Sequence, residues 1–315
     1  MPARTRFIPW ALAFAQIIAV VLAPAAAQAT DKPFNVLCTT FPLYQIARNV
    51  TQNRASLNLE LMLPAQLGCP HDYALTPQDM HKLSRADVLI INGLGLEEFL
   101  GAPVRKANPR IQILDSSAGI KDILRYSHAE GHDHEGHADG HAGLNPHLFA
   151  SPRMAARLTL TIAEGLGRID PAGADLYARN AQAYAARLNA LAEEMRSLGR
   201  TLANTRIVTQ HGAFDYLARD MGLQVVGVVS AHAGQPPSAA QTLALVQTIR
   251  RLKAGAVFTE PQYPARIAQT IAREAGIPAA VLDPVAGGPA RAGLDYYEQA
   301  MRRNMATLKV TLGTR

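Results

Sequence analysis

Four side chains of types that bind metal ions are spread along the chain. They are His71 in GCPHDYALTP, His147 in NPHLFASP, His211 at the end of RIVTQH, and Asp283 at the end of AAVLD. Three imidazoles and one carboxylate suit tetrahedral Zn²⁺. Mn²⁺ more often has additional carboxylate oxygens, and Cu(I) has thiolate or thioether sulfur. The alternative for each histidine is a structural hydrogen bond or a place on the surface.

Short β-rich segments alternate with helical segments in both halves of the chain, which predicts parallel sheets with crossover helices. Strands are predicted over 34–40, 57–63, 87–93, 110–117, 205–211, 223–229, 256–260 and 278–283. The four candidate ligands fall in loops or at the carboxyl ends of strands, which is the edge where open α/β sheets bind ligands. We therefore predict an α/β fold of two lobes, each a parallel β-sheet flanked by helices, with two candidate ligands from each lobe.

Helices are predicted between these strands. In one of them, over 76–86, Thr76 is the expected N-cap, Pro77 the first helical residue, and Asp79 lies in the first turn. Apolar residues from Tyr177 to Leu202, spaced alternately by four and three, predict one long amphipathic helix over 172–203. This stripe could be a coiled-coil seam with another chain. We expect it to pack against both lobes instead, in a monomer.

The N-terminal region has the pattern of a secretory signal peptide. Arg4 and Arg6 precede an apolar run over 7–24, and the small residues Ala27 and Ala29 mark an expected cleavage site after residue 29. The alternative is a retained membrane anchor. We predict a signal peptide over 1–29, an N-terminal lobe over 30–171, a linking helix over 172–203 and a C-terminal lobe over 204–315. The mature protein is then expected in the periplasm.

Charge and cysteine content narrow the possible partners. The 31 Lys and Arg exceed the 25 Asp and Glu only mildly, and no dense basic patch interleaves with aromatic residues, which argues against a nucleic-acid partner. Cys38 and Cys69 are the two cysteines of the sequence. In an oxidising compartment they can form a disulfide, and the alternative is two free thiols.

Six of the ten histidines lie within residues 128–147. The run over 128–143 is rich in Gly, Asp, Glu and Ala and has no apolar periodicity, so we predict a surface loop. The zinc-protease motif H-E-x-x-H is absent from it. We expect an accessory loop that binds metal weakly and passes it to the main site, and the alternative is a solvated loop without a role in uptake. Its histidines are His128, His132, His134, His137 and His141.

Five ordered motifs carry a resemblance to a known family. PHDYALTPQD, NPHLFASP, QHGAFDYLARDMGLQVVGV, FTEPQ and VLDPVAGG resemble the cluster A-I metal-binding solute-binding proteins of ABC transporters, the zinc/manganese family. The resemblance covers nearly the whole mature chain. It implies two α/β lobes joined by one long rigid helix, with a metal ion bound between them and no enzymatic activity. It also implies that the ion is delivered to a membrane permease that works with an ATPase.

The same resemblance assigns roles to residues of this chain. The ligands it implies are His71, His147, His211 and Asp283. Manganese members of the family tend to have Glu where this chain has His211, so the resemblance favours zinc over manganese. The remaining alternatives are a manganese-binding homologue, a zinc buffer or chaperone, and a zinc hydrolase.

Two further residues, Glu260 and Cys69, are of metal-binding types but are not among the ligands that the resemblance implies. Glu260 in FTEPQ is expected to orient a ligand by hydrogen bonding rather than to bind the ion. Cys69 stands two residues before His71 and could be an additional ligand, but we favour a disulfide with Cys38.

Overall fold

The computed structural model describes Met1 and residues 33–70, 73–127, 143–230 and 236–315. It divides the chain into two units, Met1–Lys32 and Pro33–Arg315, and everything below concerns the second. The predicted signal peptide, the candidate ligand His71 and the five histidines of the predicted accessory loop lie outside the described residues. Within the described part, no helix has both the length and the apolar character needed to cross a bilayer.

The first half of the body forms a four-stranded parallel sheet in the order β2-β1-β3-β4. Thr76 caps α2 as predicted: its hydroxyl accepts a bond from the Asp79 backbone N–H, and the Asp79 carboxylate accepts one from the Thr76 N–H. The elements are β1 (Phe34–Cys38), α1 (Phe41–Thr51), β2 (Leu57–Leu61), α2 (Pro77–Arg85), β3 (Val88–Ile91), α3 (Gly101–Ala107) and β4 (Gln112–Asp115).

The second half repeats this arrangement in the order β6-β5-β7-β8, again with all strands parallel. Two of its helices, α6 and α8, end where Gly222 and Gly276 adopt the left-handed conformation that glycine tolerates best. The predicted α/β fold class with two parallel sheets is therefore confirmed. The elements are β5 (Arg206–Thr209), α6 (Asp215–Met221), β6 (Gln224–Val228), α7 (Ala239–Leu252), β7 (Ala256–Thr259), α8 (Arg266–Ala275) and β8 (Ala279–Val281).

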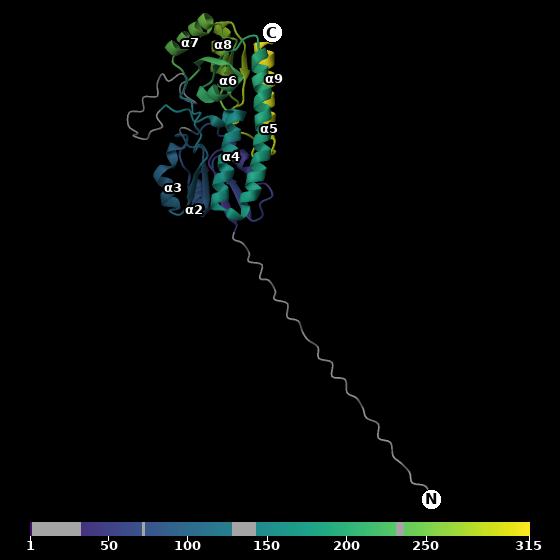
Figure 1. The fold of residues 1–315 in the computed structure, drawn as a ribbon. Coiled ribbons are helices and arrows are strands. Elements are labelled where there is room, and N and C mark those ends of the chain that lie inside the picture. Colours follow the sequence, from purple (N-terminus) through teal and green to yellow (C-terminus); the bar gives the residue numbers. More distant parts are fainter. Residues whose placement is uncertain (2–32, 71–72, 128–142, 231–235) are drawn as a thin grey trace. The chain divides into compact units, whose positions relative to one another are not determined.

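A long helix, α5 (Ala174–Thr201), comes between the two sheets in the sequence, two residues shorter at each end than predicted. Its predicted apolar stripe is buried, from Tyr177 to Met195. Helix α4 (Pro152–Ile169) packs along it, as Figure 1 shows, and α9 (Tyr296–Leu312) also contacts it. A single hydrophobic cluster includes residues of β1, α5, β5 and α9, so the stripe is used inside this chain.

Candidate metal centre

Two neighbouring strands of the second sheet position His211 and Glu260. Strands β5 and β7 pair directly, with Thr209 opposite Phe258, so the residues that follow them emerge at the same edge. Both side chains are almost completely buried, and Nδ1 of His211 lies 2.6 Å from Oε1 of Glu260. This contact uses Nδ1. The other ring nitrogen, Nε2, is buried, and the ring is also hydrogen-bonded to the Cys69 side chain.

The short segment between the His-rich run and helix α4 positions His147. Oδ1 of Asn145 accepts a bond from the His147 backbone N–H at 3.0 Å and lies 2.8 Å from Nδ1 of the His147 ring. An amide oxygen only accepts hydrogen bonds, so Nδ1 carries the proton. The lone pair of the neutral ring is therefore on Nε2, the atom that would bind a metal ion.

The orientation of Asn145 is itself fixed by the second half of the body. Its amide nitrogen donates to the Gly212 carbonyl at 2.7 Å and to Oδ2 of Asp215 at 3.0 Å. Both partners accept, so the amide cannot be reversed without placing its oxygen against two other oxygens. The side chain that holds His147 is thus bonded to the residue that directly follows His211.

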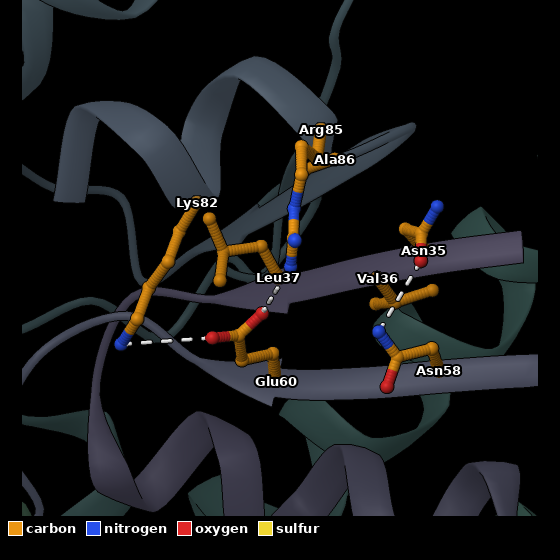
Figure 2. A pocket seen from close by; sticks show the side chains of 8 residues that line it. All are labelled: Asn35, Val36, Leu37, Asn58, Glu60, Lys82, Arg85 and Ala86. Atoms are coloured by element: carbon orange, nitrogen blue, oxygen red, sulfur yellow. Dashed lines mark hydrogen bonds and ion pairs between the residues drawn. The ribbon is translucent and has the colours of Figure 1, made fainter. Parts of the chain in front are cut away.

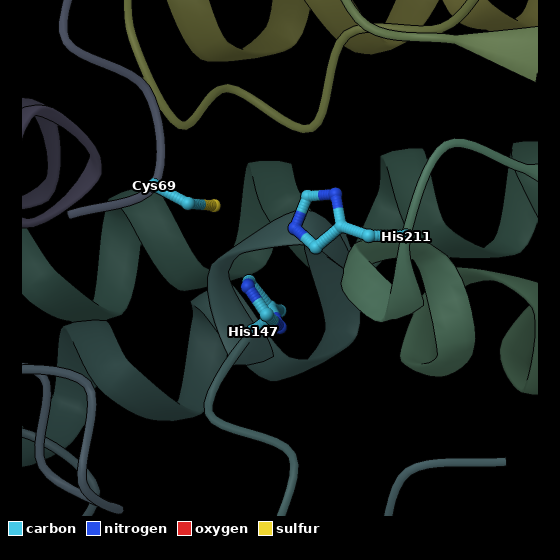
Figure 3. Close-up of side chains that lie close together, drawn as sticks. All are labelled: Cys69, His147 and His211. Atoms are coloured by element: carbon cyan, nitrogen blue, oxygen red, sulfur yellow. The ribbon is translucent and has the colours of Figure 1, made fainter. Parts of the chain in front are cut away.

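The two buried histidines and the half-buried Cys69 come together in one group. His147, His211 and Cys69 each offer one ligand atom, and these atoms all lie within 4.8 Å of one another. The two imidazole centroids are 5.0 Å apart, and the rings are inclined by 77°. Figure 3 shows the Cys69 sulfur directed toward the His211 ring, with His147 beside them. Nitrogen and sulfur donors at this spacing can hold a transition-metal ion.

The predicted ligands differ in where the structure places them. His147 and His211 are brought together, whereas His71 lies outside the described residues. Asp283 follows β8 and is not a member of the three-residue group. One carboxylate oxygen of Asp283 accepts a bond from the Val285 N–H at 2.8 Å. Cys69 is found in the group instead, and its position two residues before His71 was the one sequence signal for it.

The favoured Cys38–Cys69 disulfide is wrong in this structure, because both cysteines are free thiols. Cys38 ends β1 and is fully buried in the hydrophobic core. Cys69 is half-buried and directs its sulfur to the histidines. The sequence shows that the predicted exported protein has two thiols. Whether they form a disulfide depends on their distance and on the direction of their Cβ–S bonds, which the fold decides.

Burial and charge act together on the protons of this region. Burial by itself would lower the pKa of His211, but the Glu260 carboxylate and the hydrogen-bonded Cys69 side chain outweigh it, and the pKa of His211 is raised well above its ordinary value. Burial raises the pKa of the Cys69 thiol, and also that of Asp283, where the negative charge of Glu260 adds to the effect. A cation that binds to His211 and Cys69 must therefore displace protons.

A pocket on the first sheet offers no rival site. Figure 2 shows that its charged groups pair with one another: Lys82 and Arg85 each lie 3.8 Å from a carboxylate oxygen of Glu60. None of the candidate metal ligands lines it. Its lining residues are Asn35, Val36, Leu37, Asn58, Glu60, Lys82, Arg85 and Ala86.

The hydrogen bond from His147 to Asn145 leads to a testable prediction. Asn145→Ala removes the acceptor that fixes the ring and its tautomer, so we expect the affinity for zinc, measured by chelator competition, to fall about 10- to 100-fold. Asn180→Ala is the matched control. It likewise removes a side-chain amide that makes two hydrogen bonds, in this case to two backbone carbonyls. It should lower stability without changing zinc affinity. Equal zinc affinity in the two folded variants would contradict this role of Asn145.

Comparisons with known proteins find relatives that are named for zinc. The zinc-binding protein AdcA of Streptococcus pyogenes serotype M6 is 26% identical over 290 residues, which cover 88% of this chain and 55% of that protein. This chain thus spans about half the length of the AdcA proteins that it matches. The high-affinity zinc uptake system protein ZnuA of Bacillus subtilis is 26% identical over 296 residues, covering 91% of this chain and 90% of that protein.

A solved structure is also similar. The solute-binding protein FpvC of Pseudomonas aeruginosa, in complex with Ni²⁺, matches with a TM-score of 0.76 and 29% identity, covering 89% of this chain and 97% of that one. Another structure of FpvC contains Mn²⁺. The model of one protein family, the zinc-uptake complex component A periplasmic proteins (ZnuA), matches residues 36–311. The match takes in both sheets and the whole histidine–cysteine group, and the chain belongs to this family.

Proposed function

We propose that this protein captures Zn²⁺ at the group formed by His147 and His211 and delivers it to the permease of an ABC importer. The observation that carries the proposal is the convergence of two buried imidazoles whose Nδ1 atoms are already engaged, one by Asn145 and one by Glu260. Each ring would then bind the ion through Nε2, as is typical of protein zinc sites. From the sequence, His71 is the proposed third ligand and Asp283 a candidate fourth.

Capture rather than catalysis is the chemistry that these residues support. The ligands lie in a buried place, and a catalytic zinc needs an open coordination position with a water. A zinc hydrolase would also need a general base at that water. Glu260 is the candidate base beside the ligands, and its carboxylate is held against Nδ1 of His211. The protein is therefore a binding protein of a metal transport system and not an enzyme.

The ligand types favour zinc over manganese. Both histidines offer a ring nitrogen to an ion that displaces any proton on it, and an oxygen of the Glu260 carboxylate lies against Nδ1 of His211. Imidazole suits zinc, and carboxylate-rich sites suit manganese. The AdcA and ZnuA relatives are named for zinc, whereas FpvC was solved with Ni²⁺ and with Mn²⁺. A manganese-binding homologue is therefore the second candidate.

Delivery to a permease and a periplasmic location belong to the same proposal. The family description names a periplasmic component of a zinc-uptake complex, and the Bacillus relative is named as part of an uptake system. The predicted signal peptide over 1–29 agrees with export. A zinc buffer that never meets a transporter is the alternative, and it predicts that deletion of the gene leaves zinc uptake by cells unchanged.

We also propose that the His-rich run feeds this site, because its two ends are anchored beside it. Arg125 and Leu144 form an antiparallel bridge, and the Tyr126 N–H donates to the Gly143 carbonyl at 3.2 Å. The backbone N–H and hydroxyl of Ser127 both bond to Asp215, the carboxylate that also holds Asn145. The residues that flank the His-rich run on both sides therefore lie next to Asp215 and Asn145, which orient His147.

The main site can be tested by substitution. In His211→Ala, the ion loses a buried nitrogen ligand, so a zinc titration should lose its one tight equivalent. His81→Ala is the matched control, because His81 is exposed on α2 and is not in the metal group. It should titrate like the wild type. If His211→Ala keeps the tight equivalent, the proposed site is wrong.

The accessory role predicts a different result for the His-rich run. Replacement of residues 128–142 by two glycines should leave the fold intact. The two segments that the glycines would connect are already paired in antiparallel fashion, so a short hairpin turn can join them. In the same titration we expect the weaker additional zinc ions to disappear and the tight one to remain. Loss of the tight equivalent instead would mean that the run itself holds the ion.

A further inference from the structure

We propose that the sulfur of Cys69 is a ligand of the ion held by His147 and His211, which makes this a nitrogen–sulfur site. The inference rests on the proposed function and gives it a ligand that the sequence did not assign. The Cys69 sulfur belongs to the same group of ligand atoms, all within 4.8 Å of one another. Asp283, the candidate fourth ligand from the sequence, is outside this group, and one of its carboxylate oxygens accepts a bond from the Val285 N–H.

The second observation is the buried contact between the His211 ring and the Cys69 side chain. His211 is only 2% exposed, and its ring is hydrogen-bonded to the Cys69 side chain. In Figure 3 a ring nitrogen of His211 is directed toward the Cys69 sulfur. An ion between these atoms would bind to both.

The loop that carries Cys69 is fixed against the second half of the body. The Gly288 N–H donates to the Ala65 carbonyl at 2.8 Å, and Gly68 packs against the Gln262 side chain. Gly68 has φ +82°, a backbone conformation that favours glycine, and a Cβ there would lie 3.1 Å from Cγ of Gln262, so Gln262 would have to shift. Gln262 follows Glu260 by two residues. The loop is therefore docked on the same segment that holds His211.

A thiolate ligand would change the metal preference of the site. On binding, the thiol gives its proton to solvent, and a metal–sulfur bond replaces the S–H bond. Sulfur ligands favour Zn²⁺ and Co²⁺ over Mn²⁺, which prefers oxygen. We therefore expect the cysteine to strengthen zinc binding far more than manganese binding.

The test uses Co²⁺ in the whole mature protein, because thiolate coordination to cobalt gives a sulfur-to-metal charge-transfer band in the near ultraviolet. The band should appear in the wild type and in Cys38→Ala, which removes the other thiol. It should be absent from Cys69→Ser, which should still bind Co²⁺ but hold zinc about tenfold more weakly, or about 1.4 kcal/mol. Manganese affinity should change less.

The outcomes separate this inference from the function on which it rests. Cobalt bound by the wild type without a charge-transfer band overturns the sulfur ligand and leaves zinc capture intact. A wild type that binds neither cobalt nor zinc overturns both. If Cys69→Ser does not fold, zinc K-edge absorption of the wild type decides the question. A sulfur neighbour at about 2.3 Å supports the proposal, and a shell of nitrogen and oxygen alone overturns it.

Discussion

The buried amide of Asn145 is the interaction on which the rest of the site depends. Its oxygen holds the ring and backbone of His147, and its nitrogen bonds to the Gly212 carbonyl and to Asp215. The side chain is fully buried, so each of these bonds must be made within the protein. One amide therefore sets the tautomer of His147 and connects it by hydrogen bonds to Gly212, the residue after His211.

The second constraint is the geometry of parallel sheets. Because β5 and β7 are neighbours that run in the same direction, His211 and Glu260 must emerge side by side. A buried carboxylate is tolerated when a partner compensates its charge, and here the partner is the imidazole. The same contact aims Nε2 away from Glu260, so the sheet topology prepares the ring for an ion before one arrives.

Part of this could be predicted from the sequence, for physical reasons. Strand ends are marked by where apolar runs stop, so His147 and His211 were placed in a loop and at a strand end, and the Thr76–Asp79 cap of α2 was visible as local chemistry. A helix was expected after NPHLFASP, where α4 begins, but without bounds, and α9 was not predicted, although both helices are long and contact α5. The role of Asn145 was also missed, because its partners in the second half are 67 and 70 residues away along the chain. The environment of Cys69 depends on a loop docked across the body, which no local pattern encodes.

The most direct test of the central claim is to locate the ion. Crystals of the mature protein with one equivalent of zinc would give an anomalous difference map at the zinc edge. The account predicts one strong peak between Nε2 of His147 and Nε2 of His211, about 2.0–2.1 Å from each nitrogen. A strong peak elsewhere, with neither of these nitrogens coordinated to zinc, would contradict it.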